Sequence, residues 1–259
     1  MKYHIDTIPL WDAVKQDSEC PLCILQRHNE LSEAEKLLGA AVMDPDTRIK
    51  VNGKGFCKEH QRLLIAGNNR LGLALMMQSH LEHIKPEIMK NIANSKKNQK
   101  RSFLFKKSTE AKDSADEAAK KLRDISESCI LCDRVNEHMH RYADNFITLW
   151  KNDEKFREAF RESKGVCVEH IALLLSIVPK RLNSAQAEEF ISAIESTLEK
   201  SLTRQKEEID NFCRKYDYRN RDLPWGNSKD APERVINRLQ GWCVGEEPHP
   251  DDRNKGKKY

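Results

Sequence analysis

Four short motifs of metal-binding residue types occur along this chain of 259 residues. They alternate as CPLC, CKEH, CILC and CVEH, so that each Cys-x-x-Cys pair is followed, at almost the same distance, by a Cys-x-x-His pair. Three thiolates and one imidazole complete the tetrahedral shell that zinc prefers in structural sites. Pairing each motif with the next along the chain predicts two Cys3His metal sites. The first contains Cys20, Cys23, Cys57 and His60, and the second contains Cys129, Cys132, Cys167 and His170.

A Cys3His shell leaves no open position for a water molecule or a substrate, so the predicted sites are structural rather than catalytic. We expect two zinc ions per chain, and an iron–sulfur cluster is the alternative because cysteine-rich sites also bind clusters. A structural zinc ion contributes on the order of 10 kcal/mol to folding. Loss of either site is therefore expected to reduce helicity and solubility.

The chain also carries an internal repeat around these motifs. When His60 is aligned with His170, an offset of 110 residues, an apolar stripe at helical spacing matches between the two halves. Leu81, Ile84, Ile88 and Ile92 correspond to Ile191, Ile194, Leu198 and Leu202. We therefore predict an all-α protein of two tandem helical repeats, each held by one metal site. The predicted parts are a first unit (1–94), a polar basic linker (95–127), a second unit (128–217) and a C-terminal segment (218–259) with one short helix and a loose tail.

Local signals place helices within each repeat. Asp44 and Asp153 are predicted N-caps of short helices, although Asn52-Gly53 would also suit a hairpin turn in the first repeat. Long amphipathic helices are expected near Leu71 to Ile92, where Pro86 is a candidate kink, and from Ala185 to Tyr216.

Composition limits the other functional classes. The net charge is only +4, 38% of the residues are hydrophobic, and no apolar stretch is long enough to span a bilayer. The first residues lack the pattern of a secretory leader, so we expect a cytoplasmic protein with reduced thiols and no membrane contact. Cys213 and Cys243 have no partner motif and are predicted to be ordinary buried residues.

Three further groups could bind or react. His80, His83 and Glu87 fall at helical spacing and could form an open metal site or an acid–base group, but the second repeat has no equivalent, which favours a solvated or hydrogen-bonded helix face. Glu59 and Glu169 occupy the same place in both CxEH motifs, and a cap or a hydrogen bond around the metal suits them better than general-base chemistry. The basic run could contact the phosphates of single-stranded nucleic acid, or could be a solvated linker. Its cations are Lys96, Lys97, Lys100, Arg101, Lys106 and Lys107.

The opening KYHIDTIPLWDA, the following ECPLC and the later GFCKEH resemble an uncharacterised bacterial family found in Gram-positive anaerobes. Its members are sometimes labelled substrate-binding proteins of ABC transporters. This sequence does not support that label, because we find neither a secretory leader nor the alternation of strands and helices that is typical of such proteins. The resemblance implies a coherent unit over most of the chain but no activity.

No catalytic motif occurs, so the sequence favours a non-enzymatic role. The first functional hypothesis is a binding or adaptor protein that presents helical surfaces to a protein partner. The alternative is a metal- or redox-responsive regulator in which oxidation of the Cys3His thiolates releases the metal.

Overall fold

Helices make up the regular structure of the described part of the chain. The computed structural model describes residues 7–105, 108–220 and 222–245, with side chains for all of these except 96–113. No strand occurs within these ranges, so the all-α prediction is confirmed. No helix in the described part is long and apolar enough to cross a bilayer.

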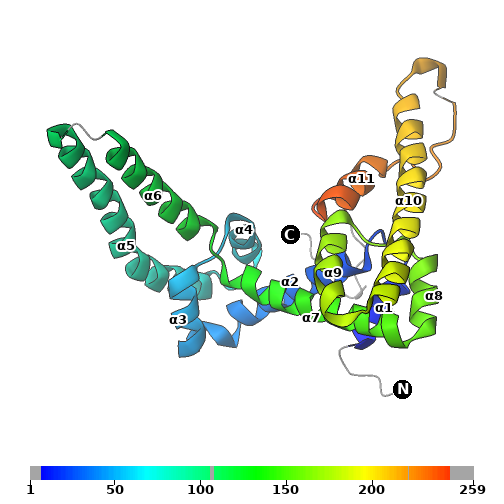
Figure 1. Ribbon diagram of the computed structural model, residues 1–259, viewed down its shortest axis with the longest axis horizontal. Coiled ribbons are helices and arrows are strands. Elements are labelled where there is room, and N and C mark those ends of the chain that lie inside the picture. Colours follow the sequence, from blue (N-terminus) through cyan, green and yellow to red (C-terminus); the bar gives the residue numbers. More distant parts are fainter. Residues whose placement is uncertain (1–6, 106–107, 221, 246–259) are drawn as a thin grey trace. The chain divides into compact units, whose positions relative to one another are not determined.

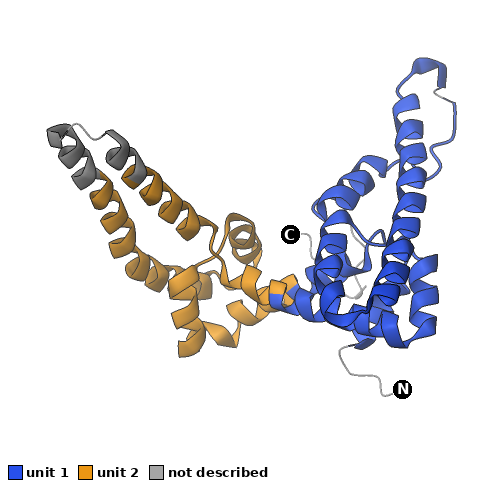
Figure 2. Ribbon diagram, in the orientation of Figure 1, with its two compact units in different colours: residues 1–29, 137–258 blue, residues 30–136, 259 orange. Residues whose placement is uncertain are grey.

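Two compact units divide the chain (Figure 2). Residues 1–29 and 137–258 form one, here called the split unit, and residues 30–136 form the other, here called the inserted unit. Helices α2 (Pro21–Leu38) and α7 (Ile130–Asn152) each begin in one unit and end in the other. The predicted boundaries at residues 94, 127 and 217 follow the order of the chain, whereas these units follow contacts in space.

The split unit is built around aromatic rings. Phe146 and Trp150 of α7 lie between α8 (Glu154–Glu162) and α10 (Ser184–Arg214), and the centroid of Phe146 is 4.9 Å from that of Phe156 on α8. The rings of Trp150 and Phe190, the latter from α10, lie 5.1 Å apart in an edge-to-face arrangement, which is a favoured geometry for aromatic pairs. The further helices of this unit are α1 (Ile8–Val14), α9 (Val168–Arg181) and α11 (Ala231–Gln240) (Figure 1).

The inserted unit has an aliphatic core. Leu64 of α4 (Lys58–Ala66) and Met76 of α5 (Arg70–Phe105) are almost completely buried, as is Val51 of α3 (Pro45–Lys54). Arg48 of α3 also donates hydrogen bonds to α5, at the Leu75 carbonyl and the Ser79 hydroxyl. This unit contains a short 3₁₀ helix (Ala40–Met43), α3 (Pro45–Lys54), α4 (Lys58–Ala66), α5 (Arg70–Phe105) and α6 (Ser108–Glu127).

The segment predicted as a linker is helical for most of its length. It contains the end of α5 and the whole of α6, and these two helices make extensive contact with each other. Ala118 of α6 is buried. The described parts of this segment, residues 95–105 and 108–127, therefore lie within the inserted unit, and the predicted domain boundaries stay a prediction.

Most of the local predictions are confirmed. Asp44 and Asp153 cap α3 and α8 by accepting backbone hydrogen bonds, and residues 45–54 are helical rather than a hairpin. Both long helices are present, with Pro86 inside α5. The prediction for the two unpaired cysteines is wrong, because Cys213 and Cys243 are exposed. Cys213 lies near the end of α10, and Cys243 follows α11, where neither is covered by the core.

Candidate metal centres

The eight predicted ligands form two groups of three cysteines and one histidine, but their pairing differs from the prediction. Cys20 and Cys23 lie beside the distant Cys167 and His170, and Cys129 and Cys132 lie beside Cys57 and His60. The first group is the split-unit site and the second is the inserted-unit site. Each CxxC pair thus meets the CxxH pair of the other half of the chain, and the pairing expected from chain order is wrong.

The length of α2 explains why each CxxC pair lies beside the CxxH pair of the other half of the chain. Cys20 directly precedes this helix of 18 residues, and Cys23 lies in its first turn; the helix spans about 27 Å at 1.5 Å per residue. The helix begins in the split unit, and its end enters the inserted unit, where α3 and α4 also lie. The CxxC at its start is therefore carried away from the CxxH at the start of α4. The same reasoning applies to α7, which has Cys129 and Cys132 at its start.

Distances between the ligand atoms fit a single tetrahedral ion in each site. A zinc ion with Zn–S near 2.3 Å and Zn–N near 2.0 Å places its ligands about 3.8 Å apart for two sulfurs and about 3.5 Å apart for sulfur and nitrogen. In the split-unit site, Cys23 Sγ lies 3.6 Å from Cys167 Sγ and 3.5 Å from His170 Nδ1. In the inserted-unit site, Cys57 Sγ lies 3.7 Å from Cys132 Sγ and 3.4 Å from His60 Nδ1. All four ligand atoms of each site lie within 4.8 Å of one another.

Both CxxH motifs use the same local backbone. A glycine with positive φ, Gly55 or Gly165, precedes an extended cysteine that is the N-cap residue of α4 or α9. The histidine three positions later lies in the first helical turn, so its ring reaches back to the cysteine sulfur. A Cβ atom on Gly55 would lie 2.5 Å from the imidazole of His80, so this glycine is required for packing as well as for its φ angle.

The two CxxC motifs also lie at helix starts. Cys20 directly precedes α2 and Cys129 directly precedes α7, so each site receives the N-terminal ends of two helices. The positive end of a helix dipole stabilises thiolates, and the Cys132 amide hydrogen-bonds to Cys129 Sγ at 3.4 Å. This arrangement offsets the net negative charge that three thiolates would retain around a divalent ion.

The inserted-unit site is tied together by contacts outside the ligands. Ile130 N donates to the Gly55 carbonyl at 3.1 Å, and Ser128 Oγ donates to the Lys54 carbonyl at 2.6 Å. Glu30 accepts a hydrogen bond from His60 Nε2 at 3.0 Å, which leaves Nδ1 facing the sulfurs. A carboxylate in this position orients a metal-binding imidazole and raises its basicity. The sequence analysis did not identify Glu30, which lies 30 residues before His60 and carries no motif.

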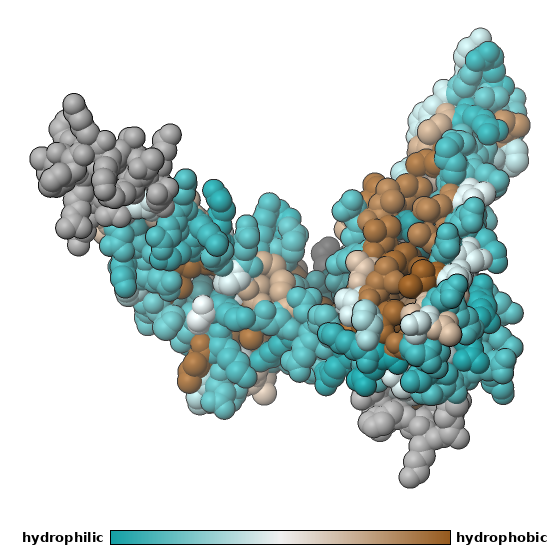
Figure 3. All heavy atoms as spheres, viewed as in Figure 1, coloured by the Kyte–Doolittle hydropathy of each residue, from teal (hydrophilic) through white to brown (hydrophobic). Residues whose placement is uncertain are grey.

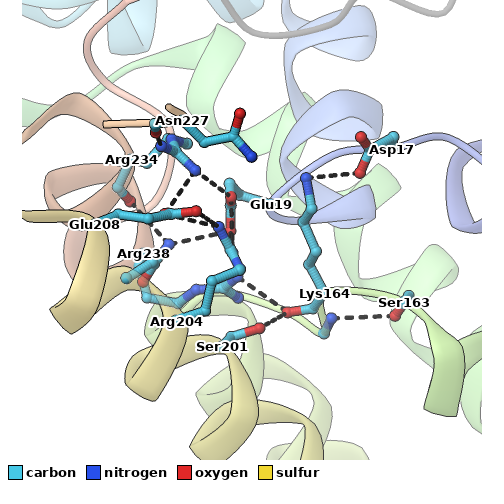
Figure 4. A network of polar contacts seen from close by, with 12 residues as sticks. Asp17, Glu19, Ser163, Lys164, Ser201, Arg204, Glu208, Asn227, Arg234 and Arg238 are labelled. Carbon is cyan, nitrogen blue, oxygen red and sulfur yellow. Dashed lines mark hydrogen bonds and ion pairs between the residues drawn. The ribbon is translucent and has the colours of Figure 1, made fainter. Parts of the chain in front are cut away.

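A buried ionic network supports the split-unit site (Figure 4). Glu19, the residue before Cys20, accepts hydrogen bonds from Arg204 and Gln205 of α10 and from Arg238 of α11. Arg238 is 0% exposed and also donates to the carbonyl of Lys164, three residues before Cys167. The network therefore joins both ligand pairs of this site to α10 and α11. Sequence reasoning missed it because its members are spread over the whole chain.

In the metal-free protein, the imidazoles and thiols of each Cys3His group share protons that a divalent cation can replace. Burial lowers the pKa of His60, but hydrogen bonds to Cys129 and Glu30 outweigh burial and raise that pKa to about 10. For His170, burial is likewise outweighed by the Cys20 charge and the Cys167 hydrogen bond, and the pKa is raised to about 10. A hydrogen bond from Cys132 lowers the pKa of Cys129 to about 3 and at the same time raises the pKa of Cys132. Each metal-free site thus holds negative charge beside protons that a divalent ion can displace.

The other candidates do not form a metal site. His80 Nδ1 donates to the Asn52 carbonyl at 2.8 Å, while His83 and Glu87 are exposed, and the three do not group with one another. His80 therefore packs α5 against the end of α3.

Glu59 and Glu169 do not touch the candidate ligands through any hydrogen bond in the described part of the chain. Glu59 forms an exposed pair with Arg62, and Glu169 lies against Gly241 after α11. The side chains of Lys96, Lys97, Lys100, Arg101, Lys106 and Lys107 lie outside the described residues, so the nucleic-acid hypothesis for them stays a prediction.

Fold and geometry define an all-helical protein with two buried or half-buried Cys3His groups that are compatible with metal binding. Residues 1–246 match a family described as a family of unknown function (DUF6062), and the chain belongs to this family. No curated protein and no solved structure matches the chain. The expectation of an uncharacterised family is confirmed, whereas its bacterial origin and its transporter label stay untested.

Proposed function

We propose that this protein is a non-enzymatic binding or adaptor protein of the cytoplasm, stabilised by two structural zinc ions. The observation that carries the proposal is the ligand geometry. Each site offers three sulfurs and one imidazole nitrogen at the separations of a single tetrahedral shell, with no position left for a substrate.

The same geometry favours zinc over an iron–sulfur cluster. The ligands of a cluster bind to separate iron atoms, whereas the four ligand atoms in each site here lie within 4.8 Å of one another and can share one ion. Three thiolates and one imidazole form a common structural zinc shell.

Exposed apolar side chains support a binding role. On the split unit, Leu175 of α9 and Ile191 and Leu202 of α10 are 39%, 45% and 41% exposed. Figure 3 shows apolar side chains gathered on this unit over the region of α9 and α10. A contiguous apolar patch on a protein surface commonly marks an interaction site.

Metal analysis tests the structural part of the proposal. Protein purified without added metal is expected to contain two zinc ions per chain, and removal of both by a chelator is expected to abolish most of the helical signal in circular dichroism. A brown preparation that contains iron, or a metal-free protein that keeps its full helicity, would contradict it.

A surface variant tests the binding part. Leu175→Asp changes an exposed residue and should leave zinc content and helicity unchanged, while it reduces recovery of a partner that copurifies from the protein's own cells. Ser176→Asp, at the neighbouring exposed position of α9, is the matched control. If no protein copurifies with the wild type, or if both variants retain it equally, this surface has no binding role.

One observation favours the alternative of a redox-responsive regulator. In the inserted-unit site, Cys57 and Cys132 are only half-buried and their sulfurs are 3.7 Å apart, whereas all ligands of the split-unit site are buried. A two-electron oxidant such as hydrogen peroxide could join these two sulfurs as a disulfide and release one ion. Stepwise peroxide treatment should then release one zinc equivalent before the other. Release of both together, or of neither, removes this alternative.

A further inference from the structure

A solvent-open groove of about 900 Å³ runs along the inserted unit. One wall is α4 and the other is α5, and the end of α6 closes part of it. Its floor contains the buried side chains of Phe56, Leu73 and Ile84. Ile65 of α4 and Leu81 of α5 line it as well, although they are 50% and 61% exposed. The groove therefore presents an apolar surface to solvent.

The charged residues that line this groove are all cationic. They are Lys54, Lys58, Arg62 and Arg70, and no aspartate or glutamate is among the lining residues. Lys54 pairs with Asp133 and Arg62 pairs with Glu59, so these two are partly neutralised. The side chains of Lys58 and Arg70 are exposed and make no ion pair or hydrogen bond with any described residue. The groove thus combines an apolar floor with two unpaired cations, which favours a ligand that is apolar on one side and carries carboxylates.

The shape of the groove favours a helix over a small molecule. Its α5 wall extends from Arg70 to Ile88, which corresponds to about 27 Å of helix. Leu81, Ile84 and Ile88 recur along this wall at the spacing of one helix face. Pockets for small ligands enclose most of the ligand surface, whereas an amphipathic helix lies along an open groove of this kind.

We propose that the groove between α4 and α5 binds an acidic amphipathic helix of a partner protein. The apolar stripe of that helix packs on Ile65, Leu81 and Ile84, and carboxylates beside the stripe pair with Lys58 and Arg70. This inference rests on the proposed binding function and specifies the partner class for one surface.

The inserted-unit site controls the position of one wall. Cys57 and His60 hold the first turn of α4, and the groove residues Arg62 and Ile65 follow within the same helix. Without the metal, α4 loses the ligand bonds that join Cys57 and His60 to Cys129 and Cys132, and the start of α7 is held only by hydrogen bonds such as that from Ile130 N to the Gly55 carbonyl. Binding of the helix is therefore expected to require an intact inserted-unit site.

A synthetic peptide provides the probe. The peptide is an 18-residue helix with leucines at positions i, i+3, i+4 and i+7 and glutamates beside them, and a matched peptide has lysine in place of each glutamate. Fluorescence anisotropy with the full-length, zinc-loaded protein should show about two- to thirtyfold tighter binding of the glutamate peptide, as expected for two added ion pairs on an exposed surface.

Variants locate the binding surface. Arg70→Glu should weaken the glutamate peptide and strengthen the lysine peptide, and Leu81→Asp should weaken both. Lys90→Glu reverses an exposed charge on α5 outside the groove and should leave both affinities unchanged. Zinc content is measured for each variant, and both groove residues are exposed enough to be changed without loss of folding.

The outcomes separate this inference from the proposed function. A protein with two zinc ions that binds the two peptides equally, or whose Arg70→Glu variant binds like the wild type, overturns the inference and leaves the structural zinc proposal intact. Displacement of the peptide by palmitate or by a single-stranded oligonucleotide at lower concentration than by unlabelled peptide also overturns it, in favour of a lipid or a nucleic acid. A protein without zinc contradicts the proposed function itself.

Discussion

Removal of the Glu19 carboxylate should destabilise the split unit more than removal of any exposed charged side chain. Glu19 accepts hydrogen bonds from Arg238 Nη2 at 2.7 Å and from Arg204 Nη2 at 2.7 Å. Arg238 is 0% exposed, and its Nε and Nη1 atoms have no partner in the described part of the chain. Glu19→Ala would leave this guanidinium buried with only the Lys164 carbonyl as an acceptor.

The expected cost follows from the burial of Arg238. Breaking a buried ion pair by removal of one partner costs about 3–5 kcal/mol, because the remaining charge is uncompensated. Asp210→Ala on α10 is the control, because it removes a partly exposed ion pair with Lys206. It should lower the free energy of unfolding by less than about 1 kcal/mol. The double variant Glu19→Ala/Arg238→Met removes the buried charge together with its partner, so it should be more stable than Glu19→Ala alone.

Urea unfolding followed by circular dichroism measures these free energies, and a chelator assay measures metal retention. Because Glu19 adjoins Cys20, Glu19→Ala should lose zinc from the split-unit site first and retain the second equivalent. Equal free energies of unfolding for Glu19→Ala and Asp210→Ala would refute the reasoning, as would a double variant less stable than Glu19→Ala.

Three further predictions concern the sites and the inserted unit. Glu30→Ala removes the acceptor of His60 Nε2 and should weaken zinc binding at the inserted-unit site by about 10–100-fold in a chelator competition, whereas unchanged affinity would contradict the assigned role. Because the pKa values of His60 and His170 are about 10, zinc binding at pH 7 should displace protons, and calorimetry in two buffers of different ionisation enthalpy should detect this; absence of proton release would be evidence against both sites. Burial alone would raise the pKa of Glu33, but the hydrogen bonds and charges of Lys36 and Arg134 have the larger effect, so the pKa is lowered in the folded protein. The stabilising contribution of the Glu33 carboxylate is therefore present above the unfolded pKa of about 4.3 and is lost as pH falls through the folded value. Glu33→Gln should thus cost about 1–2 kcal/mol at pH 7, and this difference from the wild type should shrink, not grow, on acidification.

The ligand residues and the helices that carry them could be predicted because their signals are local. Residue type and spacing identified all eight residues of the two Cys3His groups, and the capping residues Asp44 and Asp153 identified the short helices. The two halves of the chain also contain helices in the same order, from α2 to α5 and from α7 to α10. The internal repeat itself stays a prediction.

The pairing of the motifs could not be read from spacing alone. It depends on whether the chain turns back after each CxxC, and similar spacing in both halves fits either arrangement. One local signal was available, since no glycine or proline interrupts the chain between Leu22 and Leu38, which favours a continuous helix that carries the CxxC away. Contacts such as that between Glu19 and Arg238, which are 219 residues apart, have no local signal at all.

The exchange of ligand pairs between the two halves is tested most directly by metal counting in two double variants. Cys23→Ser/Cys167→Ser removes two ligands of the split-unit site, and we expect the purified protein to retain one zinc ion per chain. Cys23→Ser/Cys57→Ser removes one ligand from each site, and we expect it to retain none. The opposite result, with no zinc in the first variant and one ion in the second, would show that each half of the chain closes its own site and would contradict the exchanged pairing.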